Sequence, residues 1–237
     1  VKYFEENSSV DLKDFILKVH FSSPHLARSL DREVEWVFSN FKTSFDVMLD
    51  DLIDESKKLL YFNDLEVIFN KLRILKRRVA LIVACADICK IWSLSKVTLK
   101  LTQFADSSLS TAFDAVVRNF SMKKKKSEFN AVFGSRKNIK SSDLGFIVIA
   151  MGKMGAFELN YSSDIDFNVF YDSKIFGKDQ LLTFQPILIK ITKDVIKLMS
   201  EINEEGYIFR CDLRLRPEPS VNPVCMPVKF ALEYYKE

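Results

Sequence analysis

Glycine does not occur in residues 1–133, and Pro24 is the only proline in that stretch. Both residue types interrupt helices, so this part of the chain has few positions at which a helix must end. Apolar residues recur there at three- and four-residue spacing, for example in 45–53 and 65–79. The sequence therefore predicts a bundle of amphipathic helices over residues 1–120.

Cysteine and histidine are also scarce, with four and two residues in the chain. Cys85 and Cys89 lie four residues apart, but no second pair with the spacing of a zinc site accompanies them. Both histidines lie near the beginning of the chain, far from Cys211 and Cys225. This pattern argues against a structural zinc site, and all four thiols are expected to be buried and reduced.

Long apolar runs are missing too. The longest, residues 79–86, is far shorter than the roughly 20 residues that span a bilayer, and no secretion signal is visible at the start. The net charge of +3 argues against nucleic-acid binding over the whole surface. We therefore expect a cytoplasmic protein that binds neither membranes nor nucleic acid.

What the sequence does contain is typical of a folded protein, with 48% hydrophobic residues, 28% charged residues and 21 phenylalanines. A short apolar run at 144–151 predicts a buried strand. A glycine turn at 152–155 follows, and residues 179–204 and 227–236 predict two further helices. The predicted fold class is α+β, with an amino-terminal helical bundle followed by a domain that contains a sheet.

Residues 121–143 separate these two regions. Between 121 and 140, seven basic residues accompany a single acid, Glu128. We interpret the segment as a solvated, basic linker between a helical region, 1–120, and a catalytic domain, 144–237. Contact of the basic run with nucleic acid or an acidic partner is the alternative.

Two segments of the second region combine apolar alternation with charge. The first, 160–171, reads Asn-Tyr-Ser-Ser-Asp-Ile-Asp-Phe-Asn-Val-Phe-Tyr, and the second, 206–217, reads Gly-Tyr-Ile-Phe-Arg-Cys-Asp-Leu-Arg-Leu-Arg-Pro. Because side chains alternate faces along a strand, the first segment would present Asp164, Asp166 and Asn168 together. The polar face of the second would consist of Arg210, Asp212, Arg214 and Arg216.

If the two segments are neighbouring strands, three carboxylates converge beside several arginines. Carboxylates that cannot move apart require a cation, and Mg²⁺ accepts a few carboxylates together with phosphate oxygens. Asp164 and Asp166 would hold Mg²⁺ against the phosphates. Asp212 would complete the shell of a second ion or orient the attacking oxygen. This is the layout of a nucleotidyl or phosphoryl transfer site.

Phosphate oxygens could be bound from several sides. The candidates offer accessible backbone N–H groups, hydroxyl groups or positive charge. They are Gly152, Lys153, Ser162, Ser163, Arg214 and Arg216. Glycine lets the backbone approach a phosphate closely, and arginine can bind two phosphate oxygens at once, whereas lysine acts as a point charge. The alternative for the arginines is an ion pair with Asp212 or with surface acids, and Lys153 could be an ordinary loop lysine.

Three motifs together resemble a known family. Met-Gly-Lys-Met-Gly at 151–155, Glu-Leu-Asn-Tyr-Ser-Ser-Asp-Ile-Asp at 158–166 and Asp-Leu-Arg-Leu-Arg-Pro at 212–217 are similar to the signature of glutamine synthetase adenylyltransferases. These are bifunctional adenylyl-transferring and adenylyl-removing enzymes. Residues 22–28, Ser-Ser-Pro-His-Leu-Ala-Arg, resemble a stretch near their amino terminus, and residues 76–87 resemble their helical region.

The resemblance implies a nucleotidyltransferase domain of the DNA polymerase β type, with a mixed sheet flanked by helices. It also implies Mg²⁺ at Asp164, Asp166 and Asp212. Members carry two such domains. One attaches AMP from ATP to a tyrosine of glutamine synthetase, and the other removes it with phosphate, giving ADP. Glutamine and the PII signalling protein are the implied regulators.

This chain departs from the family pattern in two ways. Family members are several times longer, so the chain could hold only one catalytic half. Many of them also follow Arg-Leu-Arg-Pro with glycines, where this sequence has Glu-Pro-Ser-Val-Asn-Pro-Val at 218–224. The shape of the site near Arg216 is therefore expected to differ.

The particular residues within these motifs favour the adenylyl-removing half. Ser163 stands where the adding half tends to carry glycine, and the Ser-Ser-Pro at 22–24 belongs near the start of the full enzyme. Phosphorolysis also suits Lys153, Arg214 and Arg216, which could hold inorganic phosphate beside another phosphate. Two alternatives stay open: the adenylyl-adding half or another nucleotidyltransferase, and a non-catalytic fragment that binds nucleotide or glutamine synthetase.

Overall fold

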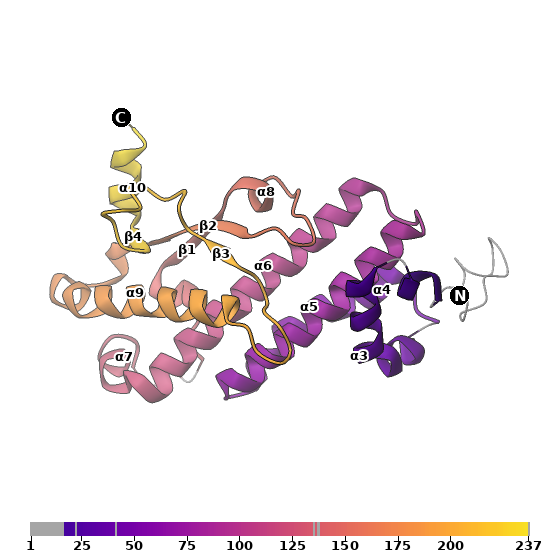
Figure 1. Ribbon diagram of the computed structural model, residues 1–237. Helices are drawn as coiled ribbons and strands as arrows, with labels where there is room; N and C mark the ends of the chain where they lie inside the picture. Colours follow the sequence, from indigo (N-terminus) through magenta and orange to yellow (C-terminus); the bar gives the residue numbers. More distant parts are fainter. Residues whose placement is uncertain (1–16, 22, 41, 135, 137, 237) are drawn as a thin grey trace.

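The computed structural model describes residues 17–21, 23–40, 42–134, 136 and 138–236 (Figure 1). Its helical part consists of α3 (Pro24–Asn40), α4 (Phe45–Lys58), the 3₁₀ turn η1 (Leu59–Tyr61), α5 (Leu65–Ile88) and α6 (Leu94–Asn119). The next elements are η2 (Phe120–Lys124), α7 (Lys126–Phe133), η3 (Ser141–Leu144), β1 (Phe146–Ala150), α8 (Gly152–Gly155), β2 (Ile165–Tyr171) and η4 (Ser173–Ile175). The last are α9 (Lys178–Ser200), β3 (Cys211–Asp212), β4 (Cys225–Pro227) and α10 (Val228–Tyr234).

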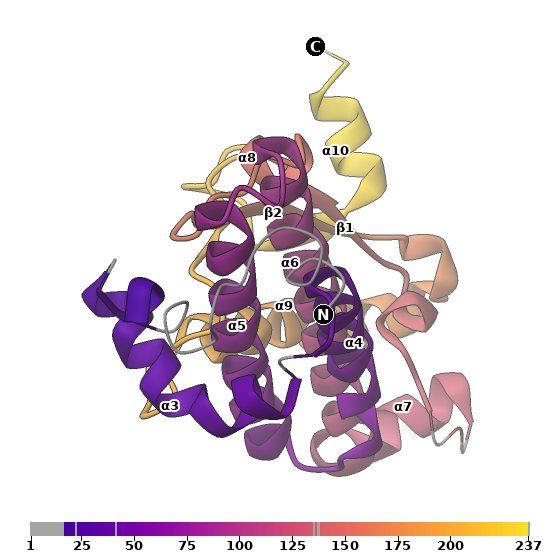
Figure 2. The same ribbon diagram turned by 90° about the vertical axis from the view of Figure 1, so that its right-hand side faces the viewer.

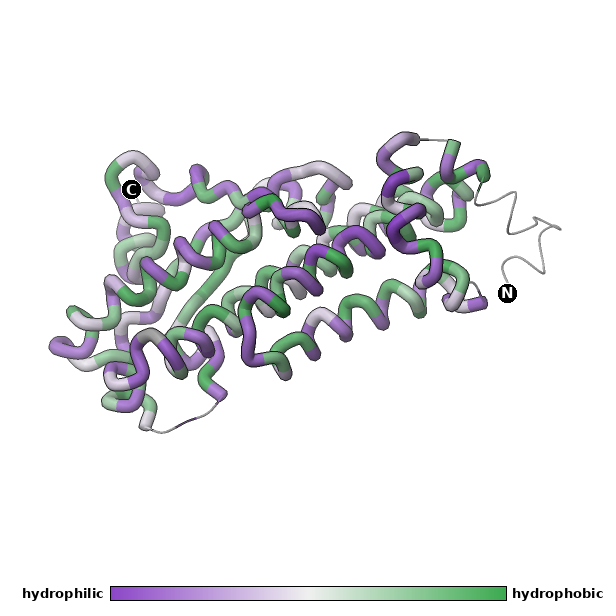
Figure 3. Tube along the Cα trace, turned by 60° about the horizontal axis from the view of Figure 1, so that its bottom comes forward, coloured by the Kyte–Doolittle hydropathy of each residue, from purple (hydrophilic) through white to green (hydrophobic). Residues whose placement is uncertain are grey.

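Local sequence determines where the amino-terminal helices begin. The side-chain oxygens of Ser44, Asp64 and Ser93 accept hydrogen bonds from backbone N–H groups in the first turns of α4, α5 and α6. Hydrophobic and hydrophilic residues then alternate along these helices, as the hydropathy-coloured trace shows (Figure 3). The predicted helical region is confirmed for the residues that the structure describes.

Strand β2 lies at the centre of a small mixed sheet. It pairs antiparallel with β1, parallel with β3 at its start and parallel with β4 at its end. Helices α6 and α9 pack against each other and cover one face of this sheet (Figures 1 and 2). On the opposite face, Ile147 and Ile149 of β1 are 41% and 45% exposed. The α+β fold class, with a mixed four-stranded sheet, is therefore confirmed.

The two charged segments form shorter strands than the sequence predicts. In the first, the strand begins only at Ile165, and the preceding residues form a turn. In the second, only Cys211 and Asp212 are extended, because the Asp212 carboxylate accepts a 2.8 Å hydrogen bond from the backbone N–H of Arg214 and closes a turn. The prediction of one continuous strand over 206–217 is therefore wrong.

Two smaller expectations also need correction. The predicted glycine turn at 152–155 is the short helix α8. Cys89 is exposed because it directly follows the last turn of α5, and Cys211 is only partly buried, so the expectation of four buried thiols holds for Cys85 and Cys225 alone. All four are free cysteines. No helix among the described residues is long and apolar enough to cross a membrane.

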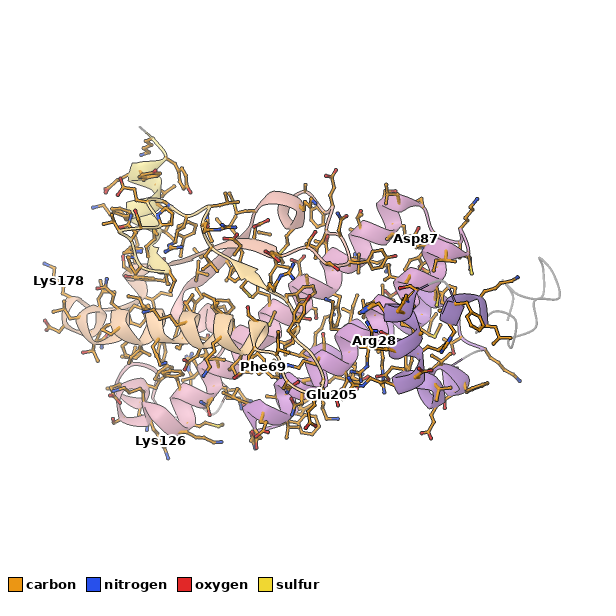
Figure 4. All side chains as sticks on the ribbon, viewed as in Figure 1. Arg28, Phe69, Asp87, Lys126, Lys178 and Glu205 are labelled. Carbon is orange, nitrogen blue, oxygen red and sulfur yellow. The ribbon has the colours of Figure 1, made fainter. Side chains whose placement is uncertain are left out.

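Part of the predicted basic linker packs into the hydrophobic core. Helix α7 places Phe129 at 0% exposure, with its ring centroid 5.3 Å from that of Phe184 on α9. Phe133 and Phe176 complete a cluster of aromatic rings around Phe184. The expectation of a solvated loop is therefore wrong for α7, although its single lysine, Lys126, does face solvent at the periphery of the molecule (Figure 4). The division of the chain into two domains stays a prediction.

The packing of α7 can be tested with one substitution. Phe129→Ala should lower the free energy of unfolding by about 3–5 kcal/mol, because it leaves a cavity among rings that cannot fully close around it. Urea denaturation measures this change. Phe38→Ala, at an exposed position of α3, is the matched control and should change stability by less than about 1 kcal/mol. Equal, small effects of both substitutions would show that α7 lies outside the cooperative core.

Candidate functional site

Asp166 and Asp212 come from the two charged segments and lie side by side. Their backbones are directly paired in the parallel register of β2 and β3. Asp164 immediately precedes β2. The pKa of Asp166 is raised above its ordinary value. Partial burial is the largest cause, and the negative charges of Asp212 and Asp164 add to it. Asp166 thus lies close enough to Asp212 and Asp164 to be repelled by the charge of both, and the predicted convergence of all three carboxylates on a metal stays a prediction.

Arg210 supplies the positive charge that faces Asp164. Its Nε lies 2.5 Å from Asp164 Oδ1, and its Nη2 donates a 2.9 Å hydrogen bond to the carbonyl oxygen of Ser162. Both side chains of the ion pair are about half exposed. Arg210 therefore connects the turn before β2 to the residues before β3.

Arg214 forms the corresponding pair with Asp212. Its Nε lies 3.0 Å from Oδ1 and 2.8 Å from Oδ2, and its Nη2 also donates to Oδ2. These hydrogen bonds hold the pKa of Asp212 below its ordinary value, whereas partial burial acts in the opposite direction. The Arg214 side chain is 82% exposed, so it covers the carboxylate from the solvent side.

Gly152 is in direct contact with the carboxylate cluster. Its φ of +52° favours glycine, and a Cβ atom at this position would lie 2.6 Å from Asp166 Oδ2. The backbone N–H of Met151 donates a 2.8 Å hydrogen bond to the carbonyl of Asp166, which holds the start of α8 against β2. Lys153 follows on the surface, where its charge slightly opposes the rise in the pKa of Asp166.

The remaining predicted residues lie around this cluster or turn away from it. Ser162 is exposed, and Ser163 Oγ accepts a hydrogen bond from the backbone N–H of Asn160 at 3.3 Å. Arg216 points into its own loop, where it donates to the carbonyls of Leu213 and Pro219, each at 2.7 Å. Burial lowers the pKa of Arg216. A role of Arg216 in phosphate binding stays a prediction that requires this loop to rearrange.

Sequence reasoning assigned no role to two residues of the site. The sequence places Arg210 on the polar face of its segment. Its position two residues before Asp212 is the only sequence feature that could have indicated its role in holding a carboxylate. Asn168 is 1% exposed and donates from Nδ2 to the carbonyl of Leu215 at 3.2 Å. Its Oδ1 is buried without a hydrogen-bond partner among the described residues. Asn168 therefore positions the turn after β3 through its amide nitrogen.

The donor chemistry of the cluster fits Mg²⁺. All candidate ligands are carboxylate oxygens, which hard cations prefer, and the raised pKa of Asp166 reflects negative charge that a cation would relieve. Within the described part of the chain, no three His, Cys, Asp or Glu side chains are already gathered as a metal site. Asp164 and Asp212 point instead to Arg210 and Arg214. Metal binding would therefore require these arginines to release carboxylate oxygens.

Most of this chain is similar in sequence to known bacterial proteins. A bifunctional glutamine synthetase adenylyltransferase/adenylyl-removing enzyme from Agrobacterium fabrum is 32% identical over 230 residues, which cover 95% of this chain and 23% of the relative. Proteins of the same name from Bradyrhizobium diazoefficiens and Caulobacter vibrioides are 36% and 38% identical over 192 and 177 residues. These matches cover 81% and 73% of this chain, and 19% and 17% of the relatives.

The chain thus spans about a fifth of the length of these relatives. A family model described as glutamate-ammonia ligase adenylyltransferase matches residues 16–237, which include the carboxylate cluster and nearly all of the helical region. The length and identity of these matches agree with the motifs at Gly152, Asp164 and Asp212. The chain belongs to the glutamate-ammonia ligase adenylyltransferase family.

Proposed function

We propose that this chain is a Mg²⁺-dependent nucleotidyltransferase unit, with a catalytic domain of the DNA polymerase β type, that acts on glutamine synthetase. The observation that carries the proposal is the paired register of Asp166 and Asp212, with Asp164 and Gly152 beside them. Family membership supports the substrate, because the relatives are named for their action on glutamine synthetase. Regulation by the PII protein remains part of the proposal for a longer protein.

Each residue of the cluster has a role in this proposal. Asp164, Asp166 and Asp212 would hold Mg²⁺, which when bound would neutralise charge on the phosphate oxygens. Arg210 and Arg214 hold two of these carboxylates through partly or largely exposed ion pairs, which are weak and readily exchanged. Once released, Arg214 could turn its guanidinium fork to a phosphate group. Gly152 leaves room for this exchange because it places no side chain against Asp166.

For the direction of the reaction, we propose removal of AMP from the modified tyrosine by phosphorolysis, with release of ADP. Inorganic phosphate is then the nucleophile, and it needs cations to lie beside a second phosphate. Lys153 and Arg214, both on the exposed side of the cluster, are suitable groups. The same carboxylates would serve the adenylyl-adding reaction with ATP, so the assignment rests on Ser163 and on the surrounding cations.

The first prediction for this site concerns the metal. Mg²⁺ should strengthen ADP binding, and Asp166→Asn should abolish that metal-dependent gain because it removes the central carboxylate. Calorimetric titration with ADP, with Mg²⁺ and with EDTA, measures the effect. Asp179→Asn, an exposed aspartate in the first turn of α9, is the control and should bind as the unchanged protein does.

The same variant has a second readout that does not depend on nucleotide. Without metal, Asp166→Asn should leave the melting temperature unchanged or raise it, because a carboxylate repelled by Asp212 and Asp164 is neutralised. A large fall in melting temperature would show that Asp166 is a structural residue. Equal ADP affinity with Mg²⁺ and with EDTA would contradict the metal site itself.

The second prediction concerns Arg214. Arg214→Lys should weaken binding of ADP and phosphate by about threefold to tenfold, because a two-pronged guanidinium becomes a point charge. Calorimetry at low salt measures both affinities. Arg136→Lys, at an exposed position far from the site in sequence, is the matched control. If Arg214→Lys and Arg214→Ala both bind as the unchanged protein does, the ion pair with Asp212 is the whole role of Arg214.

The third prediction concerns the reaction. The chain, incubated with adenylylated glutamine synthetase, Mg²⁺ and phosphate, should release ADP, and Asp166→Asn should release none. A parallel incubation with unmodified glutamine synthetase and ATP tests the opposite direction. Transfer of AMP in that second reaction, without ADP release in the first, would assign the adenylyl-adding function. Nucleotide binding without turnover in either reaction would identify a non-catalytic binding unit.

A further inference from the structure

A cavity of about 600 Å³ lies between α3, α5 and the two turns that lead toward β2 and β3. Figure 4 labels three residues from its walls, Arg28 on α3, Asp87 on α5 and Glu205 in the turn that precedes β3. Apolar side chains of α5, among them Leu81 and Ala84, line one wall. The volume lies within the usual range for sites that bind small molecules.

Two of the three acidic residues that line this cavity are already engaged, and the third, Glu204, is exposed to solvent. Asp87 accepts a 3.2 Å hydrogen bond from the hydroxyl of Tyr161. Glu205 is paired with Arg32 at 2.9 Å and with Arg77 at 2.7 Å. Glu205 therefore compensates two of the arginines that line the cavity, whereas Asp87 is bound by a neutral hydroxyl group.

Three cations in the lining face no carboxylate at hydrogen-bonding distance. Arg28 is exposed and forms no hydrogen bond or ion pair with any described residue. Lys76 donates to the carbonyl of Ile208 at 3.2 Å and lies 4.1 Å from the centre of the Phe209 ring. Arg73 is 4% exposed and bonds to the carbonyls that end α9, while its Nε has no partner within the described part of the chain. The cavity thus combines three cations that have no directly paired carboxylate among the described residues with an apolar wall.

We propose that this cavity is a binding site for a small organic anion, whose carboxylate or phosphate head contacts Arg28 and Lys76 and whose apolar body contacts α5. A guanidinium fork and an ammonium group are the donors that such heads use. Burial, and then the positive charge of Arg210, lower the pKa of Lys76 to about 8. A bound anion would offset this cost of holding Lys76 charged.

This site is separate from the carboxylate cluster but adjacent to it. Asp164, Asp166 and Asp212 do not line the cavity, whereas Tyr161 and Ser162 do. The carbonyl of Ser162 is bound by Arg210, which also holds Asp164. The proposal rests on the charges of the cavity and does not require the chain to be a nucleotidyltransferase.

Phenyl phosphate and benzoate are suitable probes, because they share an aromatic body and differ in the anionic head. Each should bind one site in calorimetric titrations with EDTA at low salt, whereas neutral benzyl alcohol should not bind. Arg28→Gln should weaken binding of the preferred anion by about tenfold or more, the usual scale for losing a charged hydrogen bond. Arg136→Gln, at another exposed arginine that does not line the cavity, should have no effect. The stronger of the two probes identifies the head group.

Lys76→Gln provides the second test and should also weaken binding of the anion. Circular dichroism checks that this variant is folded. Asp166→Asn should leave anion binding unchanged, even if it abolishes metal-dependent nucleotide binding. The proposal is overturned if neither probe saturates a single site. It is equally overturned if Arg28→Gln and Lys76→Gln both bind normally, or if Asp166→Asn removes the binding.

Discussion

A carboxylate fixed on a central, buried strand is the constraint on which the site depends. Strand β2 is paired with three other strands, and all its residues except Asp166 are buried. Asp166 is therefore held by the sheet and cannot move away from Asp212, whose backbone is paired with it. The repulsion between the carboxylates is fixed by the fold, so the surrounding groups must compensate it.

The compensation comes from arginines on the same short segment as Asp212. Arg210 and Arg214 flank it two residues away on each side and bind Asp164 and Asp212 respectively. Because the arginine of each pair is largely open to solvent, screening by water and salt weakens both pairs. Pairs this weak stabilise the cluster without locking it, and a metal or a phosphate can replace them at small cost. The exposure of these arginines is therefore compatible with a site that exchanges charged ligands.

The sequence predicted the charged residues of the site better than the lengths of the strands and helices that carry them. Side-chain alternation placed Asp166 and Asp212 on the polar faces of two segments, and the register of β2 and β3 pairs these two residues directly. The length of β3 could not be read in this way, since it is limited by the turn at Arg214 and by a partner strand distant in sequence. Helix α7 was missed because the run of four lysines at 123–126 dominates the local composition, although Phe129 and Phe133 have helical spacing.

The helical region also contributes directly to the position of the charged segments. Arg73 binds the carbonyls of Leu198 and Glu201 at the end of α9, and Lys76 binds the carbonyl of Ile208 shortly before β3. These contacts fix the chain that leads to Asp212, while the hydrogen bond between Tyr161 and Asp87 holds the turn that leads to Asp164. Arg73, Lys76 and Asp87 of α5 thus hold the two segments that lead to Asp164 and Asp212. A sheet domain without α5 would keep the register of its strands but lose the supports that aim both segments at the same point.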